Sequence, residues 1–372
     1  SYHVKALGTD YHMANDSVIL RPDNIWIRGA RAFDDMGGPG MTEHSATVDA
    51  HLMHDCLKKL SFNINIDGHN ILGYNFPQQG SMSFYGTAYA DAQVQLTGKP
   101  GSTTIDVDVT PTRGTTLIYN VATPGTVTET EFVTYQAKSE EQRVKNNSEL
   151  LEDGTNSNSS LLTLNSSLPE ENSDLRINFN INANPDAQIR ILMDPRTGDN
   201  ISLRGDGLLS ADYYNKGRFQ LRGTYRVSEG NYRMSIRDLI RKDFTFQPDG
   251  TIVFSGDAME AELNLKAIHT VPNVSLDDLS STGLGLSNTR VDCIMMLEGT
   301  PRQPVVSFDF DIPNANEDEK QMVRSMLSSE EERDMQAVYL LGVGRFYTYG
   351  SLGGTKQTKS GMAMISILSS AL

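Results

Sequence analysis

The residues with the clearest potential for metal chemistry are His51, His54 and Cys56, which stand together in the run DAHLMHDC. Imidazole and thiolate groups are the usual ligands of zinc. On a β-strand, however, successive side chains point to opposite faces, so His51 and His54 are expected to face apart. The sequence therefore predicts an incidental grouping and no metal site.

Carboxylates recur in pairs two residues apart, as Asp106 with Asp108 in IDVDV and Asp309 with Asp311 in FDFDIP. Paired carboxylates can act as general acid and base, but alternate carboxylates on one strand face are most often solvated. The chain has no GxSxG nucleophile elbow, no Walker lysine and no dinucleotide fingerprint. A β-helical enzyme acting on polysaccharide would need clustered carboxylates, whereas the polar positions here are mostly Asn, Thr, Gln and Arg. We expect no enzyme and no cofactor.

The charge balance limits the partners. The 372 residues include 32 basic and 47 acidic side chains, a formal net charge of −15, which argues against a nucleic-acid-binding protein. One basic cluster stands out, and it predicts either a solvated edge or a contact with a headgroup or a partner: Arg233, Arg237, Arg241 and Lys242. Two distant cysteines say little about the redox compartment, and Trp26 is expected in the core. No apolar run is long enough for a membrane-spanning helix.

The elements that would position any site are β-strands. In residues 175–183, LRINFNINA, apolar and polar side chains alternate with period two, and FQLRGTYRV at 219–227 repeats the pattern. Such alternation is typical of strands with one buried and one solvated face. Asp-Gly pairs and many single glycines supply turns, as in antiparallel hairpins. The sequence predicts an all-β protein.

Helices are expected only near the C-terminus, over about 317–341, where Ser329 and Glu332 have the spacing of a capping box. The stretch 138–173 is rich in Asn, Ser and Glu, and this composition predicts a polar flexible loop or insertion. It divides an N-terminal sheet segment, 1–137, from a C-terminal β domain, 174–372. The last residues, 361–372, could form a short helix or a buried strand.

The number of strands creates a packing problem. About eighteen strands at a spacing of ~4.8 Å would extend roughly 85 Å, and open sheets of that size curl or split. Two short helices cannot cover such a face. The sheet therefore either closes on itself around packed side chains, or curls into a trough whose apolar interior holds acyl chains. Alternation alone does not choose between them.

The segment from about Leu175 to Tyr349 resembles the conserved C-terminal region of the TamB family of AsmA-like envelope proteins. The pattern G-T-Y-x-V-x-E-G-x-Y occupies 223–232, and G-T-I-x-F-x-G occupies 250–256. LEGTPRQPVVSFDFDIP at 297–313 is followed by an acidic helix and LLGVGRF at 340–346. Residues 1–137 match only as the same style of strand.

The resemblance implies a long curled antiparallel or mixed sheet, a trough with an apolar interior. It implies a periplasmic protein of a Gram-negative cell, spanning between an upstream inner-membrane anchor and an outer-membrane β-barrel of the TamA/BamA type. Its work would be phospholipid transport, assistance to outer-membrane protein assembly and secretion, or both. The predicted lipid-groove lining is Leu175, Ile177, Phe179, Ile181, Phe219, Leu221, Tyr225, Val227, Ile252, Phe254, Leu263 and Leu265.

Two further expectations concern the ends. The chain opens at Ser1 and closes within an apolar run, so we expect a fragment of a longer protein. Family members normally continue into more strands, and the uncharged tail, with Ile365 and Ile367, is expected to contact a partner. The alternative to a lipid conduit remains a structural or adhesive β-sandwich with a filled core.

Overall fold

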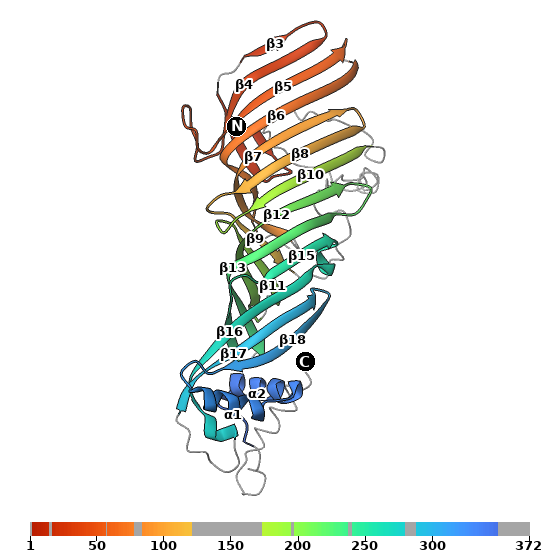
Figure 1. Cartoon of the computed structure of the whole chain (residues 1–372). Coiled ribbons are helices and arrows are strands. Elements are labelled where there is room, and N and C mark those ends of the chain that lie inside the picture. The colour runs from red at the N-terminus through yellow and green to blue at the C-terminus, as the bar shows by residue number, and fades with distance from the viewer. Residues whose placement is uncertain are drawn as a thin grey trace, which may run out of the picture.

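One mixed sheet of 18 strands forms the body of the protein in the computed structural model (Figure 1), which confirms the predicted fold class. The structure describes residues 2–14, 17–56, 58–77, 84–120, 173–194, 197–236, 240–279 and 288–348. The N-terminal strands are β1 (Tyr2–Val4), β2 (Thr9–Met13), β3 (Val18–Leu20), β4 (Asn24–Phe33), β5 (Ser45–Asp55), β6 (Lys58–Phe76), β7 (Phe84–Lys99), β8 (Ser102–Pro111) and β9 (Thr116–Asn120).

The C-terminal part repeats this strand style and ends in helices. Its strands are β10 (Asp174–Ala183), β11 (Gln188–Asp194), β12 (Asp199–Tyr214), β13 (Gln220–Ile236), β14 (Ile240–Phe246), β15 (Thr251–Gly256), β16 (Glu262–Ser275), β17 (Asn288–Thr300) and β18 (Gln303–Asp311). Two short 3₁₀ turns, Ala258–Glu260 and Leu276–Leu279, flank β16. The α-helices α1 (Glu317–Met326) and α2 (Glu330–Val343) pack at the same end of the molecule as β17 and β18 (Figure 1).

Each α-helix begins at an N-cap residue whose side chain accepts a backbone hydrogen bond from the first turn. Ser329 Oγ accepts a hydrogen bond from Glu332 N at 3.2 Å, which confirms Ser329 as an N-cap. The reciprocated capping box lies one helix earlier. There, Asn316 Oδ1 accepts from Glu319 N at 2.8 Å, and Glu319 Oε2 accepts from Asn316 N at 2.9 Å.

The sheet bends along a line that crosses its strands. On the first side of the line, β10 pairs with β8 and with residues 207–214 of β12; on the second side, β11 pairs with β9 and with residues 199–203. Figure 1 shows β8 and β10 in front, with β9 and β11 behind them. We call these layers the first and second walls. The bend in β12 lies at a register shift between Arg204 and Gly205, and a Cβ at Gly205 would meet Arg226 O at 2.1 Å.

Strand pairing changes direction at one seam. β8 pairs with β10, and β9 with β11, in parallel, whereas the other strand pairs of the described residues are antiparallel. Parallel neighbours cannot be joined by a tight hairpin. Residues 121–172, which contain most of the predicted polar loop, fall between β9 and β10 and lie outside the described residues.

Candidate functional site: an apolar trough closed at one end

The apolar positions of neighbouring strands stand opposite one another and form continuous rows. The central row of the first wall crosses eight strands without a polar side chain. Its members are Ala30, Val48, Ile66, Val94, Val107, Phe179, Ala211 and Leu221. A row on a sheet face arises because each strand alternates with period two and the register keeps the apolar positions in phase.

The second wall carries a row rich in aromatic residues. Its members are Phe84, Tyr119, Ile191, Ile201, Tyr232 and Phe244. Ile201, Tyr232 and, from the first wall, Leu209 all pack against one hydrophobic cluster, so the apolar faces of both walls turn toward the same interior. The site is therefore a trough bounded by two apolar walls.

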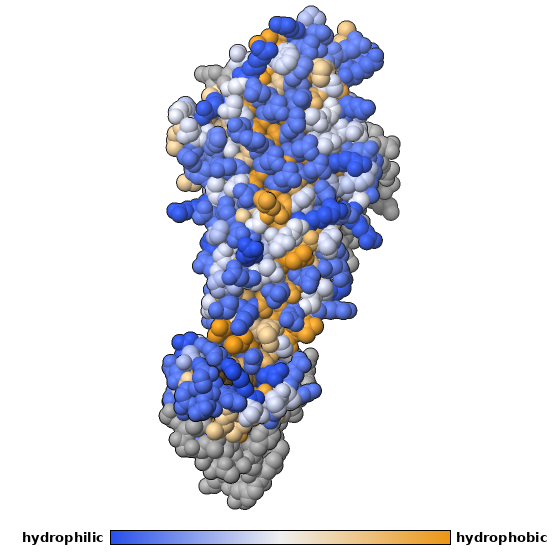
Figure 2. All heavy atoms as spheres, in the orientation of Figure 1, coloured by the Kyte–Doolittle hydropathy of each residue, from blue (hydrophilic) through white to orange (hydrophobic). Residues whose placement is uncertain are grey.

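The trough differs along its length. In β10, the apolar side chains from Leu175 to Ile181 are only half-buried, and the same holds for Ile66 and Val94 in β6 and β7. In β17, by contrast, Val291 is 0 % exposed and Met295 is 1 % exposed. Figure 2 shows apolar atoms as a stripe along the long axis, flanked by hydrophilic atoms.

The end near the helices is filled by protein. Its cluster joins β13, β14, β16, β17 and β18 to α1 and α2, with Leu340 and Phe346 both 0 % exposed. Gln336 of α2 is also buried, and its amide is satisfied: Nε2 donates to Tyr347 O at 2.9 Å and Oε1 accepts from Tyr347 N at 2.7 Å. The helices thus close this end of the trough with packed side chains.

The predicted lining residues divide between the two regions. Half-buried positions are held by Leu175, Ile177, Phe179, Ile181, Phe219, Leu221, Ile252 and Phe254. Buried positions are held by Tyr225, Val227, Leu263 and Leu265. The same alternation predicted all twelve residues, but only the first set is partly exposed, and within it Ile252 and Phe254 also pack against the cluster of the closed end.

Burial in the walls changes the acidity of the side chains there. Desolvation raises the pKa of Tyr225 to about 12, with a smaller contribution from the charge of Asp206. Burial also raises the pKa of the Cys293 thiol to about 12. These shifts fit a low-dielectric interior in which a charged group would be disfavoured.

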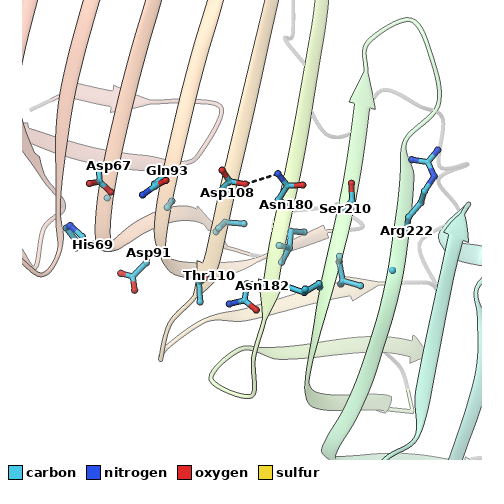
Figure 3. Close-up of a pocket in the computed structure, with 17 residues that line it drawn as sticks. Asp67, His69, Asp91, Gln93, Asp108, Thr110, Asn180, Asn182, Ser210 and Arg222 are labelled. Carbon is cyan, nitrogen blue, oxygen red and sulfur yellow. Dashed lines mark hydrogen bonds between the residues drawn. The ribbon is translucent and has the colours of Figure 1, made fainter.

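A hollow of about 710 Å³ crosses β6, β7, β8, β10, β12 and β13. The small residues Gly68, Ala92 and Gly223 stand in the same cross-strand row as Ile181 and Leu209. Figure 3 shows one polar side chain after another along adjacent strands of this hollow, including Gln93, Asp108, Asn180, Ser210 and Arg222.

The polar face of the sheet is an amide and carboxylate ladder. Asn178 Nδ2 donates to Asp106 Oδ1 at 2.6 Å. Asn180 Nδ2 donates to Asp108 Oδ1 at 2.7 Å, as Figure 3 shows. Of the carboxylate pairs in the sequence, Asp106 and Asp108 are thus engaged in cross-strand side-chain contacts. Among the described residues, no three His, Cys, Asp or Glu side chains are grouped so as to hold a metal ion.

Trp26 lies outside the core, so the expectation of a core position was wrong. Alternation places Ile25 and Ile27 toward the interior and Trp26 on the opposite face, where its ring stacks on His51 at 3.5 Å between centroids. His51 also hydrogen-bonds Asn24 Oδ1 through Nε2, at 2.6 Å.

The structure divides the basic cluster between two faces. Arg233 Nε binds Asp243 Oδ1 at 2.9 Å on the polar face, and Arg241 is exposed there. Lys242 instead shares the apolar face with Phe244 and Phe246, which are buried. The period-two alternation of KDFTF contains this information, whereas the predicted cluster was defined by charge alone. Arg237, Ile365 and Ile367 lie outside the described residues.

The fold and the site define a class: an elongated, curled β-sheet protein with an apolar trough, closed at one end by a helix pair. Within the described part of the chain, no helix has the length and apolarity to cross a bilayer. Residues 35–372 match the family model of the TamB C-terminal domain, so the chain belongs to the TamB C-terminal domain family. No curated protein and no solved structure matches the chain.

Family membership supports a TamB-like role in biogenesis of the cell envelope. The family is known as a non-enzymatic transport and assembly module associated with the envelope, and it suggests a TamA-type outer-membrane partner in general.

Proposed function

We propose that the open part of the trough binds the acyl chains of phospholipids and conducts them through the periplasm toward the outer membrane. The observation that carries this proposal is the central row of the first wall, which crosses eight strands without a polar side chain and stays half-buried over β10. A conduit needs such continuity, because one polar gap in the lining would interrupt the favourable burial of a moving chain.

The energetics favour an apolar occupant. Each methylene group transferred from water to an apolar environment contributes about 0.8 kcal/mol. Contiguous exposed apolar surface beyond a few hundred Å² is unusual in a soluble monomer and marks a binding surface. An acyl chain is apolar over its whole length, so it matches a row that extends across many strands.

The filled-core alternative describes only part of the molecule. Packed side chains occupy the interior beside β16, β17 and the helices, where Leu265 is 4 % exposed. The same kind of position in β10, such as Ile177, remains half-buried. We therefore assign the structural role to the closed end and the binding role to the open part.

The partner and location are further parts of the proposal. We place the protein between an inner-membrane anchor upstream and an outer-membrane β-barrel of the TamA/BamA type. Support comes from β18, whose Phe308 backbone is held by side chains of α2: Asp334 Oδ1 accepts from Phe308 N, and Arg333 Nε donates to Phe308 O at 3.2 Å. Side-chain bonds of this kind can be exchanged for those of an added strand, a mode by which sheets take up partners or client strands in barrel assembly.

Site-specific photo-crosslinking tests the lipid proposal. A photoreactive side chain at Ile177 or Phe179 should capture phospholipid from vesicles, because both side chains face the trough. The same group at Asn178, between them on the polar face, is the matched control and should capture little. Equal labelling at Phe179 and Asn178, or no labelling at either, would contradict the proposal.

A further inference from the structure

The second wall carries two opposite charges on its apolar face. Asp199 in β12 stands on the same side as Ile201 and Leu203, which pack on or within the hydrophobic cluster. Lys242 in β14 stands on the same side as Phe244 and Phe246. Charged groups on an apolar face are costly unless they are paired, so their presence requires an explanation.

Neither charge is paired with a described residue. Asp199 Oδ1 is buried and accepts no hydrogen bond from the part of the chain that the structure describes. Lys242 forms no ion pair with any residue that the structure describes, whereas its neighbour on the polar face, Asp243, binds Arg233. Buried polar atoms in proteins are normally satisfied, so the free carboxylate oxygen points to a ligand.

The strand register places the two charges near each other. Asn200 stands opposite Arg233, which puts Asp199 beside Met234, and Met234 stands directly opposite Lys242. Asp199 and Lys242 are therefore two strands apart, roughly 10 Å between backbones at the usual strand spacing. The long, flexible lysine side chain can shorten the separation of the charged groups.

The phenol of Tyr232 lies close enough to Asp199 to feel its charge. Burial raises the pKa of Tyr232, and the charge of Asp199 raises it further. Tyr232 belongs to the apolar row of the second wall, between Ile201 and Phe244. The carboxylate thus acts electrostatically on the interior of the trough.

We propose that Asp199 and Lys242 form a headgroup site for a zwitterionic phospholipid, with Lys242 on the phosphate and Asp199 on the headgroup ammonium. A phosphate ester with an ammonium a few ångströms away presents both charges in one small group, so it satisfies both residues at once. Met234 lies between them, and Tyr232 lies in the next row along the second wall. Together they would form the apolar floor for the glycerol and the first methylenes. This inference rests on the proposed function, since it names which lipid the trough selects.

The charge of the whole chain favours the same choice. A formal net charge of −15 repels an anionic headgroup, and Asp199 adds a local repulsion. A zwitterionic headgroup has no net charge and avoids both. The site would therefore select headgroups bearing an ammonium against anionic headgroups of similar size.

A competition experiment on the full chain tests the site. The protein is incubated with vesicles of equal parts phosphatidylethanolamine and phosphatidylglycerol, re-isolated, and its bound lipids are quantified by mass spectrometry. We expect the wild-type protein to be enriched in phosphatidylethanolamine. Asp199→Asn should lower that enrichment about fivefold, the effect of a contact of about 1 kcal/mol, and Lys242→Gln should lower capture of both lipids.

Matched controls lie on the same strands. Asp206→Asn in β12 and Arg241→Gln in β14 make the same charge changes at exposed positions and should leave the ratio unchanged. Bound lipid in the proportions of the vesicle, or equal effects from the controls, would overturn the headgroup site while leaving the trough intact. Absence of any bound lipid on the wild-type protein would overturn the proposed function itself.

Discussion

The open trough and the closed end are built from the same kind of strand, yet they bury their apolar faces to different extents. Ile177 in β10 and Leu265 in β16 both occupy alternating apolar positions, but Ile177 is half-buried and Leu265 is 4 % exposed. The difference comes from what covers each face. The helices and the strands around β17 fill the closed end, whereas no described element covers the first wall at β10 in the same way. Burial in a curled sheet is thus decided by the covering elements and not by the strand pattern.

Truncation of one phenylalanine in each region should give the largest difference in stability between the two regions. Phe244→Ala, at a side chain that is 0 % exposed, should reduce the free energy of unfolding by about 3–5 kcal/mol, because it leaves a closed cavity. Phe179→Ala, at a half-buried side chain, should reduce it by roughly 1 kcal/mol. Urea denaturation followed by circular dichroism measures both. Equal losses would mean that the trough is as tightly filled as the closed end.

The pH dependence of stability should also differ between the two regions, because the closed end contains a partly buried ion pair between Arg290 and Asp292. Asp292 in β17 is 6 % exposed, and burial alone would raise its pKa. Hydrogen bonds from Arg290, at 2.7 and 2.9 Å, and from Thr270, at 2.6 Å, outweigh burial and hold the pKa of Asp292 below its usual value. A carboxylate with a depressed folded-state pKa stabilises the protein above its unfolded-state pKa, and this contribution is lost as the pH falls through the folded-state value.

Asp292→Asn should therefore cost about 2 kcal/mol at neutral pH, and the cost should shrink below about pH 4. The control in the open region is Asp106→Asn, which alters an exposed ladder contact with Asn178 and should change stability by less than about 0.5 kcal/mol. Urea unfolding of the wild type and both variants, from neutral pH to below about pH 4, measures these changes in the free energy of unfolding. A pH-independent cost at Asp292 would show that its charge does not stabilise the closed end.

Removal of a helix N-cap should cause the smallest loss of stability. Ser329→Ala deletes the acceptor of the Glu332 N–H bond and should lower stability by about 1 kcal/mol. Lipid capture by a photoreactive group at Phe179 should be unchanged, because the cap belongs to the closed end. Ser325→Ala in α1, which removes a hydroxyl bonded to Met322 O, controls for loss of a helix hydroxyl away from the cap. A fall in lipid capture with Ser329→Ala alone would show that the two regions are coupled.

Much of the fold can be predicted from the sequence, because strands and helix starts are encoded by short stretches of residues. The alternation in LRINFNINA gives the strand and both of its faces, and Ser329 marks the start of α2. The division of the lining into half-buried and buried sets is not local. It depends on the hydrophobic cluster that joins strand residues such as Leu265 to helix residues such as Leu340, and no pattern within a single strand contains that information.

The proposed headgroup site could not be predicted from the sequence, for a different reason. Lys242 is close in sequence to Arg233 and Arg241, and proximity suggested one basic surface. They lie on opposite faces of the sheet, because Lys242 shares its face of β14 with Phe244 and Phe246, whereas Arg241 points to the other face. Its relation to Asp199, more than forty positions earlier, depends on the register of β12, β13 and β14 and is visible only in three dimensions.

The parallel seam between β8 and β10 has a consequence for how the chain assembles. Hairpin-linked strands on either side of the seam pair with near neighbours in sequence, so each half can begin to fold alone. The pairing of β8 with β10 and of β9 with β11 must instead close a loop of more than fifty residues. Closing such a loop costs chain entropy, so we expect this pairing to form more slowly. The seam is thus the natural place where two separately expressed halves would recognise each other, and where strands could be gained or lost in evolution without disturbing the register on either side.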